Sequence, residues 1–329
     1  MISMLEKLEN IRLLIGNTRL IKLQVPNADV YAKLEYTNLF GSVKDRAAYY
    51  IVSEAIKSGQ LTADHFIVES SSGNFAIALM GICNLLGIPF VPVIDPNINE
   101  EYEKLLRLSC EVVKVQEKDQ TGGYLLTRIN TVKEILEKYR NAFWTDQYSN
   151  INNYLGYYHG LGAELCGSFK KLDYVFVGVS SGGTITGVSR RLKEHFPNVK
   201  IIAVDIEGSL IFGDVPRKRY ISGIGASKRS ELVEHAKIDE VIKVTHLNII
   251  DGCRRLLREQ SLFAGASSGA CYYAVSKYFK DRTANGRKPV VAFICPDKGS
   301  AYLNNIYDDA WVAKIAALIE EEAMLPYTT

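Results

Sequence analysis

Hydrophobic and polar positions along this chain fall into a repeated order of blocks. From about Phe66 onward, a short apolar run is followed by a turn rich in glycine or serine and then by a helical pattern. HFIVES leads through SSGN into FAIALMGICNLLG and PFVPVID, and DYVFVGV leads through SSGGT into ITGVSRRLKEHF and VKIIAVD. A helix after each strand returns the chain to start the next strand in the same direction. The pattern therefore predicts an α/β fold, a parallel sheet covered by helices.

The same pattern continues towards the end of the chain. Residues Tyr124 to Tyr139 are typical of an amphipathic helix, and LFAGASSGACYYAVSKYF and PVVAFICPDKGS give one more turn, helix and strand. With 329 residues, 47% of them hydrophobic, the chain can bury one large core or two smaller ones with a cleft between them. We expect two domains. No low-complexity tract marks a linker, so a boundary near Asn150 is an estimate.

Charge and cysteine content exclude several classes of function. Lys and Arg total 39 against 37 for Asp and Glu, and a net charge of +2 gives no global attraction to nucleic acid or to an anionic membrane. The six scattered cysteines favour reduced core thiols in a cytoplasmic protein. We see no signal peptide or membrane span. The five histidines lack ligand spacing, so no metal site is predicted.

Four polar turns that contain glycine are candidates for the ligand-binding edge of the sheet, where residues that follow strands gather. They are GSVKDR (41–46), SSSGN (70–74), SSGGT (180–184) and GASSG (265–269). SSGGT suits a phosphate, because small residues let backbone amides approach an anion and the next helix adds its positive end. An ordinary strand-to-helix turn is the alternative, and the spacing fits neither a Walker loop nor GxGxxG.

GSVKDR places Lys44 in a small-residue turn before a helical pattern. A lysine near a helix N-terminus has a lowered pKa when it is desolvated, and its neutral amine can then form an imine. Taken alone, an exposed lysine is the more common case. The run RKRY (217–220) is interpreted as a solvated loop, with an anion-binding patch as the alternative.

Five motifs occur in the order and approximate spacing of the cysteine synthase family: NLFGSVKDR, ESSSGN, GVSSGGTITG, GIGAS and AGASSGA. The resemblance runs from about Leu14 to Tyr302. It implies a two-domain, fold-type II pyridoxal-phosphate (PLP) enzyme, similar to the tryptophan synthase β-subunit. A smaller, mobile domain over 40–149 would carry the substrate loop, and 12–39 with 150–329 would form the larger, PLP-binding domain.

The resemblance also implies roles for single residues. Lys44 becomes the Schiff-base lysine and the base that moves the substrate α-proton. Asn74 would hydrogen-bond the phenolic oxygen of PLP, and Ser267 would face its pyridine nitrogen. A serine there, unlike an aspartate, does not enforce a protonated ring, which suits β-elimination better than transamination. The cofactor phosphate is expected in the turn of Ser180, Ser181, Gly182, Gly183 and Thr184.

The substrate carboxylate is expected at one loop of the small domain. That loop consists of Ser71, Ser72, Gly73 and Asn74, with Gln147 as a second contact. Its hydroxyls and amides suit a carboxylate, and its closure would exclude water. The family usually has threonine and glycine where this chain has Phe75 and Ala76. The added bulk suggests a second substrate other than sulfide.

Four segments, GGYLLTRI, DQYSN, YYHGLGAE and GSLIFGD, resemble a subgroup of the family, the N-(2-amino-2-carboxyethyl)-L-glutamate synthases. These enzymes join O-phospho-L-serine to L-glutamate through an aminoacrylate and release phosphate, which begins 2,3-diaminopropionate supply for siderophores and some antibiotics. Arg128, Tyr148 and Ser180 match positions around the leaving phosphate, which needs a cation and donors. An arginine that points to solvent is the alternative for Arg128. SSGG also departs from the subgroup, which has two threonines and one glycine.

Three other functions stay open. A cysteine synthase that uses O-acetylserine or O-phosphoserine with sulfide would share every cofactor residue. A non-catalytic relative that binds amino acids would not need Lys44, and a nucleotide-binding protein would use SSGGT alone. Members of the family are usually homodimers, so we expect a homodimer that acts on small amino acids, although no segment identifies the interface.

Overall fold

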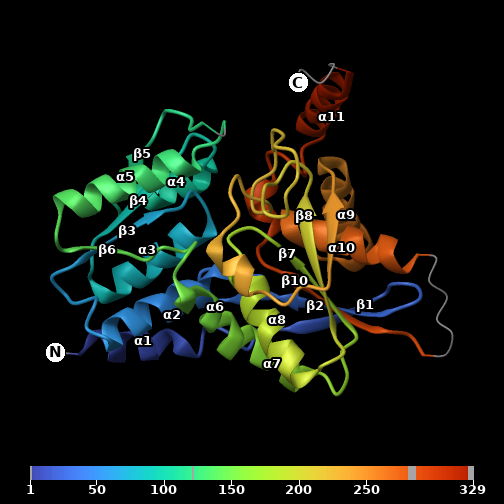
Figure 1. Ribbon diagram of the computed structural model, residues 1–329, viewed down its shortest axis with the longest axis horizontal. Helices are drawn as coiled ribbons and strands as arrows, with labels where there is room; N and C mark the ends of the chain where they lie inside the picture. The colour runs from blue at the N-terminus through green and yellow to red at the C-terminus, as the bar shows by residue number, and fades with distance from the viewer. Residues whose placement is uncertain (1, 121, 281–286, 325–329) are drawn as a thin grey trace.

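The computed structural model describes residues 2–120, 122–280 and 287–324. Its strands form two sheets, the smaller on the left of Figure 1 and the larger on the right. The larger has the order β1-β2-β10-β7-β8-β9 and the smaller the order β5-β4-β3-β6. Neighbouring strands pair in parallel apart from β1 and β2, which pair antiparallel. The predicted α/β fold with parallel-rich sheets is confirmed, and the antiparallel edge strand is an addition to it.

The strands are β1 (Leu20–Leu23), β2 (Asp29–Leu34), β3 (Phe66–Ser70), β4 (Phe90–Ile94), β5 (Val113–Lys114), β6 (Ala142–Trp144), β7 (Tyr174–Gly178), β8 (Lys200–Ile206), β9 (Glu240–Val244) and β10 (Val290–Cys295). The α-helices are α1 (Met4–Arg12), α2 (Lys44–Lys57), α3 (Asn74–Leu86), α4 (Glu100–Arg107), α5 (Leu125–Lys138), α6 (Ile151–Tyr157), α7 (Ala163–Ser168), α8 (Gly183–His195), α9 (His246–Gln260), α10 (Ala266–Phe279) and α11 (Asp309–Met324). Shorter turns of helix are η1 (Glu35–Thr37), η2 (Tyr158–Gly162), η3 (Glu231–His235) and η4 (Gly299–Tyr302).

Side-chain alternation along the strands divides the core of the larger sheet into two layers. In β7, Val175 and Val177 join one buried cluster with α2, α3 and α8, whereas Phe176 joins another with α9 and α10. Successive side chains of a strand point to opposite faces, so a strand covered on both faces is apolar throughout. A third cluster lies under α5, where Val68 and Val93 of the smaller sheet meet Val132. Helices therefore cover both faces of each sheet.

The order of elements places two of the four predicted turns at the carboxyl ends of strands, whereas 41–46 follows η1 and 265–269 follows α9. The 71–74 loop follows β3, the 180–184 turn follows β7, and residues 147 and 148 follow β6. The smaller sheet uses residues 66–144, and the larger uses 20–34 and 174–295. The domain limits at 40 and 149 stay a prediction.

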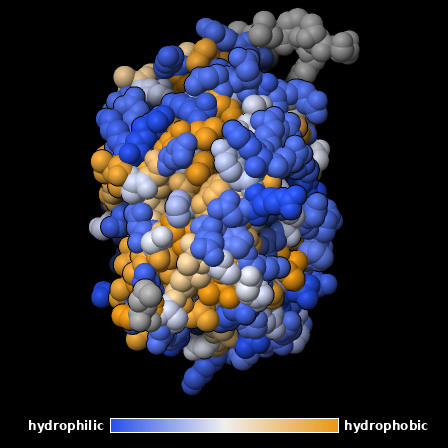
Figure 2. Space-filling model, turned by 90° about the vertical axis from the view of Figure 1, so that its left-hand side faces the viewer, coloured by the Kyte–Doolittle hydropathy of each residue, from blue (hydrophilic) through white to orange (hydrophobic). Residues whose placement is uncertain are grey.

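The surface mixes polar and apolar side chains. Figure 2 shows the face that lies on the left of Figure 1, where apolar patches break up a largely hydrophilic surface. Leu13 is 72% exposed and Leu108 is 82% exposed. Among the described residues, no helix has the length and apolar character needed to cross a membrane.

Candidate active site

Lys44 begins α2 beside the end of β10. The backbone N–H of Val43 donates to the carbonyl of Pro296 (2.8 Å), and the hydroxyl of Ser42 accepts from the Lys44 N–H (3.1 Å). The carboxylate of Asp45 accepts from the Phe40 N–H (2.6 Å) and the Ser42 hydroxyl (3.2 Å). These bonds fix the first turn of α2 and hence the direction of the Lys44 side chain.

The amine of Lys44 lies in a desolvated position. Although the side chain is partly exposed, its Nζ lies deep among protein atoms and donates to the hydroxyl of Ser181 (2.9 Å). Burial lowers the pKa of Lys44 to about 8, while the charges of Glu69 and Asp297 act in the opposite direction. Burial penalises the ammonium form, so a reactive neutral amine is present near neutral pH. The predicted imine-forming lysine therefore has the electrostatics that its chemistry requires.

Asn74, at the start of α3, is held by two hydrogen bonds. Its Nδ2 donates to Oδ2 of Asp297 (2.8 Å), and its Oδ1 accepts from the hydroxyl of Tyr102 (2.8 Å). The first bond joins the smaller sheet to the larger. The structure thus brings the 71–74 loop to the same place as the end of β10.

Asp297 is a site residue that the sequence analysis missed. It is buried, and its Oδ2 also accepts from the hydroxyl of Tyr302 (3.0 Å), while its Oδ1 has no hydrogen-bond partner among the described residues. Burial raises the pKa of Asp297, opposed by Asn74, Tyr302 and the charge of Lys44. Its position just after an apolar strand, in CPDKGS, is the sequence feature that could have identified it as a site residue.

The 180–184 turn has the close approaches that its glycines predict. Gly182 has φ +88°, and a Cβ there would lie 2.5 Å from Cγ2 of Val233. A Cβ on Gly183 would lie 2.0 Å from Oδ1 of Asn153, whose Nδ2 donates to the carbonyl of Gln147 (2.6 Å). The second glycine of SSGG therefore makes room for Asn153.

Ser180 of this turn and Ser267 of α10 both contact neighbouring backbone. The hydroxyl of Ser180 donates to the carbonyl of Gly225 (3.1 Å) in the GIGAS segment. Ser267, buried in the first turn of α10, lies against Gly178 at the end of β7, where a Cβ would come within 2.8 Å of the Ser267 Cβ. Lys44, Ser181 and Ser267 therefore lie around the carboxyl end of β7.

Arg128 points inward. Its side chain is 11% exposed, and its Nη1 donates to the hydroxyl of Ser72 (2.9 Å) and lies 3.3 Å from Oδ2 of Asp95. The Ser72 hydroxyl donates in turn to Asp95 (2.9 Å). The alternative in which Arg128 points to solvent is wrong, because the side chain lies against the 71–74 loop.

Gln147 and Tyr148 lie beside the same loop. The Gln147 side chain is buried and donates to the carbonyl of Ser70 (3.1 Å). Burial raises the pKa of the Tyr148 hydroxyl, while the charges of Arg128 and Arg219 lower it. The predicted substrate residues are therefore neighbours, with Ser71 buried and Ser72 and Gly73 partly exposed.

Two interpretations from the sequence need correction. Phe75 and Ala76 pack in the core cluster of α2 and α3, so their bulk fills the interior and carries no argument about the second substrate. In RKRY, Arg217 and Lys218 are exposed as predicted, but Arg219 is only partly exposed. Burial lowers the pKa of Arg219, which a solvated loop residue would not show.

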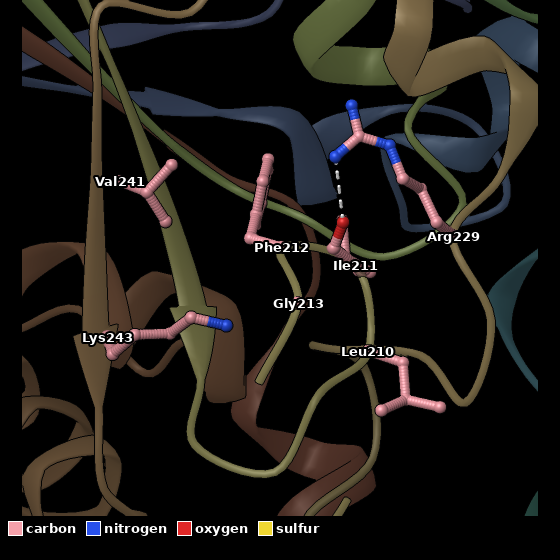
Figure 3. Close-up of a pocket in the computed structure, with 7 residues that line it drawn as sticks. All are labelled: Leu210, Ile211, Phe212, Gly213, Arg229, Val241 and Lys243. Atoms are coloured by element: carbon pink, nitrogen blue, oxygen red, sulfur yellow. Dashed lines mark hydrogen bonds between the residues drawn. The ribbon is translucent and has the colours of Figure 1, made fainter. Parts of the chain in front are cut away.

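A separate surface hollow of about 660 Å³ contains none of these residues. It lies beside β9 and is lined by Leu210, Ile211, Phe212, Gly213, Arg229, Val241 and Lys243 (Figure 3). Arg229 pairs with Glu234 (2.5 Å) and Lys243 with Asp205 (3.0 Å), so both cations are already neutralised. The chemistry of the chain is concentrated at Lys44 rather than here.

Comparison with known proteins gives concordant matches. A family model described as "Pyridoxal-phosphate dependent enzyme" matches residues 11–296. Two relatives carry the name N-(2-amino-2-carboxyethyl)-L-glutamate synthase. The protein from Cupriavidus metallidurans is 41% identical over 309 residues, which cover 92% of this chain and 91% of that protein. The protein from Ralstonia nicotianae is 40% identical over 310 residues, covering 92% and 90%.

Solved structures of related enzymes have the same fold as this chain. The O-acetylserine-dependent cystathionine β-synthase from Helicobacter pylori has a TM-score of 0.83 at 29% identity, covering 94% of this chain and 99% of that chain. A structure of O-ureido-L-serine synthase has a TM-score of 0.81 at 28% identity, covering 94% and 98%. Each of the two similarities covers 94% of this chain.

Proposed function

Because this chain belongs to the family of pyridoxal-phosphate-dependent enzymes, we propose that it joins O-phospho-L-serine to L-glutamate, forming N-(2-amino-2-carboxyethyl)-L-glutamate and phosphate. Membership of the family confirms the predicted fold-type II architecture and the predicted cofactor, PLP. The chain is a PLP-dependent enzyme of the β-replacement type that acts on small amino acids. The observation that carries the choice of substrates is the identity of about 40% to two synthases of that name.

The residues around Lys44 fit this cofactor. In the 180–184 turn, Gly182 and Gly183 keep side-chain atoms away from a place where backbone N–H groups and the positive end of α8 favour a phosphate. Lys44 and Ser267 lie in the first turns of α2 and α10, and the residue before each helix donates to the segment after β10, Val43 to Pro296 (2.8 Å) and Gly265 to Asp297 (3.0 Å). We assign the cofactor phosphate to residues 180–184 and the pyridine nitrogen to Ser267.

Lys44 has two proposed tasks. When bound, PLP makes the α-proton of an amino acid acidic and allows a group on its β-carbon to leave. Lys44 would hold the cofactor through Nζ, take the proton from Cα of the serine substrate, and return it to Cα of the product. A pKa of about 8 suits both directions of proton transfer, since a base works best when its pKa lies near the operating pH.

The 71–74 loop and the residues beside it would bind the serine substrate. We assign its carboxylate to the hydroxyls of Ser71 and Ser72, the N–H groups at the start of α3 and the side chains of Asn74 and Gln147. The Ser72 hydroxyl would exchange its bond to Asp95, and the Gln147 amide its bond to the Ser70 carbonyl. Asn74 would also approach the phenolic oxygen of PLP by exchanging its bond to Asp297. Arg128, Tyr148 and Ser180 would receive the leaving phosphate, since a buried guanidinium stabilises the charge that develops on it.

The acceptor is the part of the reaction that most needs a test. Phosphate release from O-phospho-L-serine is measured with L-glutamate, with sulfide, and with neither, and the products are identified by mass spectrometry. We expect release that depends on glutamate and a product with a new carbon–nitrogen bond. Efficient cysteine formation from sulfide with glutamate inert would identify a cysteine synthase instead, and no phosphate release under any condition would support a binding protein.

The lowered pKa of Lys44 predicts how the apoenzyme takes up its cofactor. At pH 7 an amine with a pKa of about 8 is about one-tenth neutral, whereas an ordinary lysine is neutral in only about one molecule in 3000. The rate of PLP binding should therefore rise about tenfold per pH unit below 8 and level off above it. The visible absorbance after rapid mixing gives this rate. A rate that kept rising through pH 10, as with a simple lysine derivative, would contradict the prediction.

We also propose that the enzyme is a cytoplasmic homodimer. Leu13 and Leu14 of the described chain expose 72% and 54% of their surface, which a second subunit could cover. All six cysteines lie in the described ranges, and none of them is in a disulfide, as in proteins of a reducing compartment. Size-exclusion chromatography with light scattering should give twice the chain mass of 36.7 kDa. A value of one chain mass would exclude the dimer.

A further inference from the structure

Arg219 is a partly buried cation in the long connection from β8 to β9. Its Nη2 donates to the hydroxyl of Ser227 (2.8 Å). Burial lowers the pKa of Arg219, whereas the charge of Asp205 raises it. Asp205 forms its ion pair with Lys243 (3.0 Å), and none of the carboxylates in residues 2–120, 122–280 and 287–324 lies within 4 Å of the Arg219 guanidinium. A desolvated guanidinium normally has an acidic partner, because taking its charge out of water is costly. Asp205 therefore compensates the charge of Arg219 only from beyond ion-pair distance, and the guanidinium keeps bonding capacity for the anionic group of a ligand.

The segment that holds Arg219 is bonded to the active site. The N–H of Gly225 donates to the carbonyl of Val179 (2.8 Å), and its carbonyl accepts from the hydroxyl of Ser180 (3.1 Å). The hydroxyl of Ser230 donates to the carbonyl of Tyr148 (2.7 Å). Residues 225–230 thus connect Arg219 to the proposed phosphate turn and to the proposed substrate residue Tyr148.

The same segment is anchored on its other side. The N–H of Tyr220 donates to Nε2 of His246 (3.1 Å), and its hydroxyl donates to Glu322 of α11 (2.6 Å). Because the residue next to Arg219 is tied to two helices, the backbone that carries Arg219 is fixed, and the hydrogen bond to Ser227 orients its guanidinium. A preorganised cation loses less entropy when it binds an anion.

Two arginines, Arg128 and Arg219, lie on the side of the candidate site that contains Tyr148. Arg128 contacts Ser72 of the 71–74 loop, and the connection that carries Arg219 bonds the carbonyl of Tyr148 through Ser230. Burial raises the pKa of the Tyr148 hydroxyl, as do the charges of Glu69 and Asp95, while the charges of both arginines lower it. Arg128 comes from α5 beside the smaller sheet and already lies 3.3 Å from Asp95, whereas Arg219 comes from the connection that follows β8 of the larger sheet. The two cations therefore suit two different anionic groups, one from each substrate.

We propose that Arg219 binds a carboxylate of the amino acid that acts as the nucleophile, and so selects L-glutamate as the acceptor. This inference rests on the proposed function. A guanidinium binds a carboxylate through two parallel hydrogen bonds and so fixes the orientation of the acceptor as well as its charge. Sulfide carries no carboxylate and gains nothing from this arginine. Arg219 is accordingly a specificity residue for the second half of the reaction.

The test compares Arg219→Gln with Lys228→Gln, which removes a positive charge from an exposed position of the same connection. We expect Arg219→Gln to raise KM for L-glutamate about 10- to 100-fold, the loss of one charge-assisted pair, with a smaller effect on kcat. Phosphate release from O-phospho-L-serine in a single turnover without glutamate should stay within about twofold of wild type. Lys228→Gln should leave both quantities unchanged.

Two further variants keep the test informative if Arg219→Gln folds poorly. Arg219→Lys keeps the positive charge but cannot form the bidentate hydrogen bonds to a carboxylate. Ser227→Ala removes the hydroxyl that orients the guanidinium. Both should raise KM for glutamate by less than Arg219→Gln does.

The outcomes separate the inference from the proposed reaction. If wild type uses glutamate and the Arg219 variants keep its KM, the inference is wrong and the reaction stands. If the variants lose the first half of the reaction instead, Arg219 serves the leaving phosphate and the inference is again wrong. If wild type shows no turnover with glutamate, the proposed reaction fails and this inference fails with it.

Discussion

Replacing Lys44 with alanine is expected to abolish product formation, with turnover at least about 10³-fold below wild type, because the proposed mechanism uses one nitrogen both to attach the cofactor and to transfer the proton. The structure gives this expectation its physical basis, since the amine is buried, has a pKa of about 8 and lies 2.9 Å from the Ser181 hydroxyl. The purified variant should also lose the visible absorbance of lysine-bound cofactor. Phosphate release and the absorption spectrum measure the two effects separately.

Lys57→Ala is the matched control for this prediction. Lys57 ends the same helix, has an exposed side chain and forms a surface ion pair with Glu54 (2.8 Å). Surface pairs of this kind contribute less than about 1 kcal/mol, so the variant should keep wild-type activity and colour. A Lys44→Ala protein that consumed O-phospho-L-serine at the wild-type rate would remove Lys44 from the reaction and with it the proposed mechanism.

Local features made most of the fold predictable. The apolar runs that became β3, β4, β7, β8 and β10, and the helix expected over Tyr124–Tyr139, which is α5, depend on composition and periodicity within short windows. Turn residues also have local causes. Gly182, for example, adopts a φ of +88°, which favours glycine over any residue with a Cβ.

The buried ion-pair network beside Lys44 could not be predicted from short windows of sequence. Arg46, two residues after Lys44, is buried and bonds Glu35 (2.6 Å) and Glu164 (2.7 Å), and Glu164 also pairs with Lys33 (2.6 Å). These partners come from β2, η1 and α7, separated by up to 131 positions in the sequence. Burial opposes the ionised form of Glu164, but Arg46 and Lys33 lower its pKa to about 2, so the network stays charged. Breaking one buried partner costs about 3–5 kcal/mol.

The candidate site shows the same division. Lys44, the 71–74 loop and the 180–184 turn were found because each has a recognisable motif on one short segment. Asp297 and Asn153 were missed and Arg219 was interpreted as solvated, because the burial of these residues and their contacts with other segments are not visible in a short window of sequence. Sequence periodicity says which face of a strand is buried, but it does not say which polar side chain a loop turns inward.

Arg128→Gln is expected to lower kcat/KM for O-phospho-L-serine by about 10²-fold, because the buried guanidinium offers charge-assisted bonds to the leaving phosphate that a neutral amide offers weakly. O-acetyl-L-serine has no charged leaving group, so its kcat/KM should change by less than about fivefold. The ratio of the two values is therefore the decisive quantity. It is measured from release of phosphate and of acetate with the same enzyme preparation and a saturating acceptor.

The two donors separate a role in phosphate binding from a role in holding the loop. Arg128 also contacts Ser72 and Asp95, and its loss would loosen the 71–74 loop for every substrate. A purely structural arginine would therefore lower both activities equally and lower the melting temperature, and that result would remove Arg128 from the proposed phosphate site. Lys133→Gln, an exposed position of the same helix, controls for the lost charge and should change neither activity. The ion pair between Arg128 and Asp95 is long, at 3.3 Å, and Nε of Arg128 has no hydrogen-bond partner among the described residues. Part of the bonding capacity of the guanidinium therefore remains for the substrate.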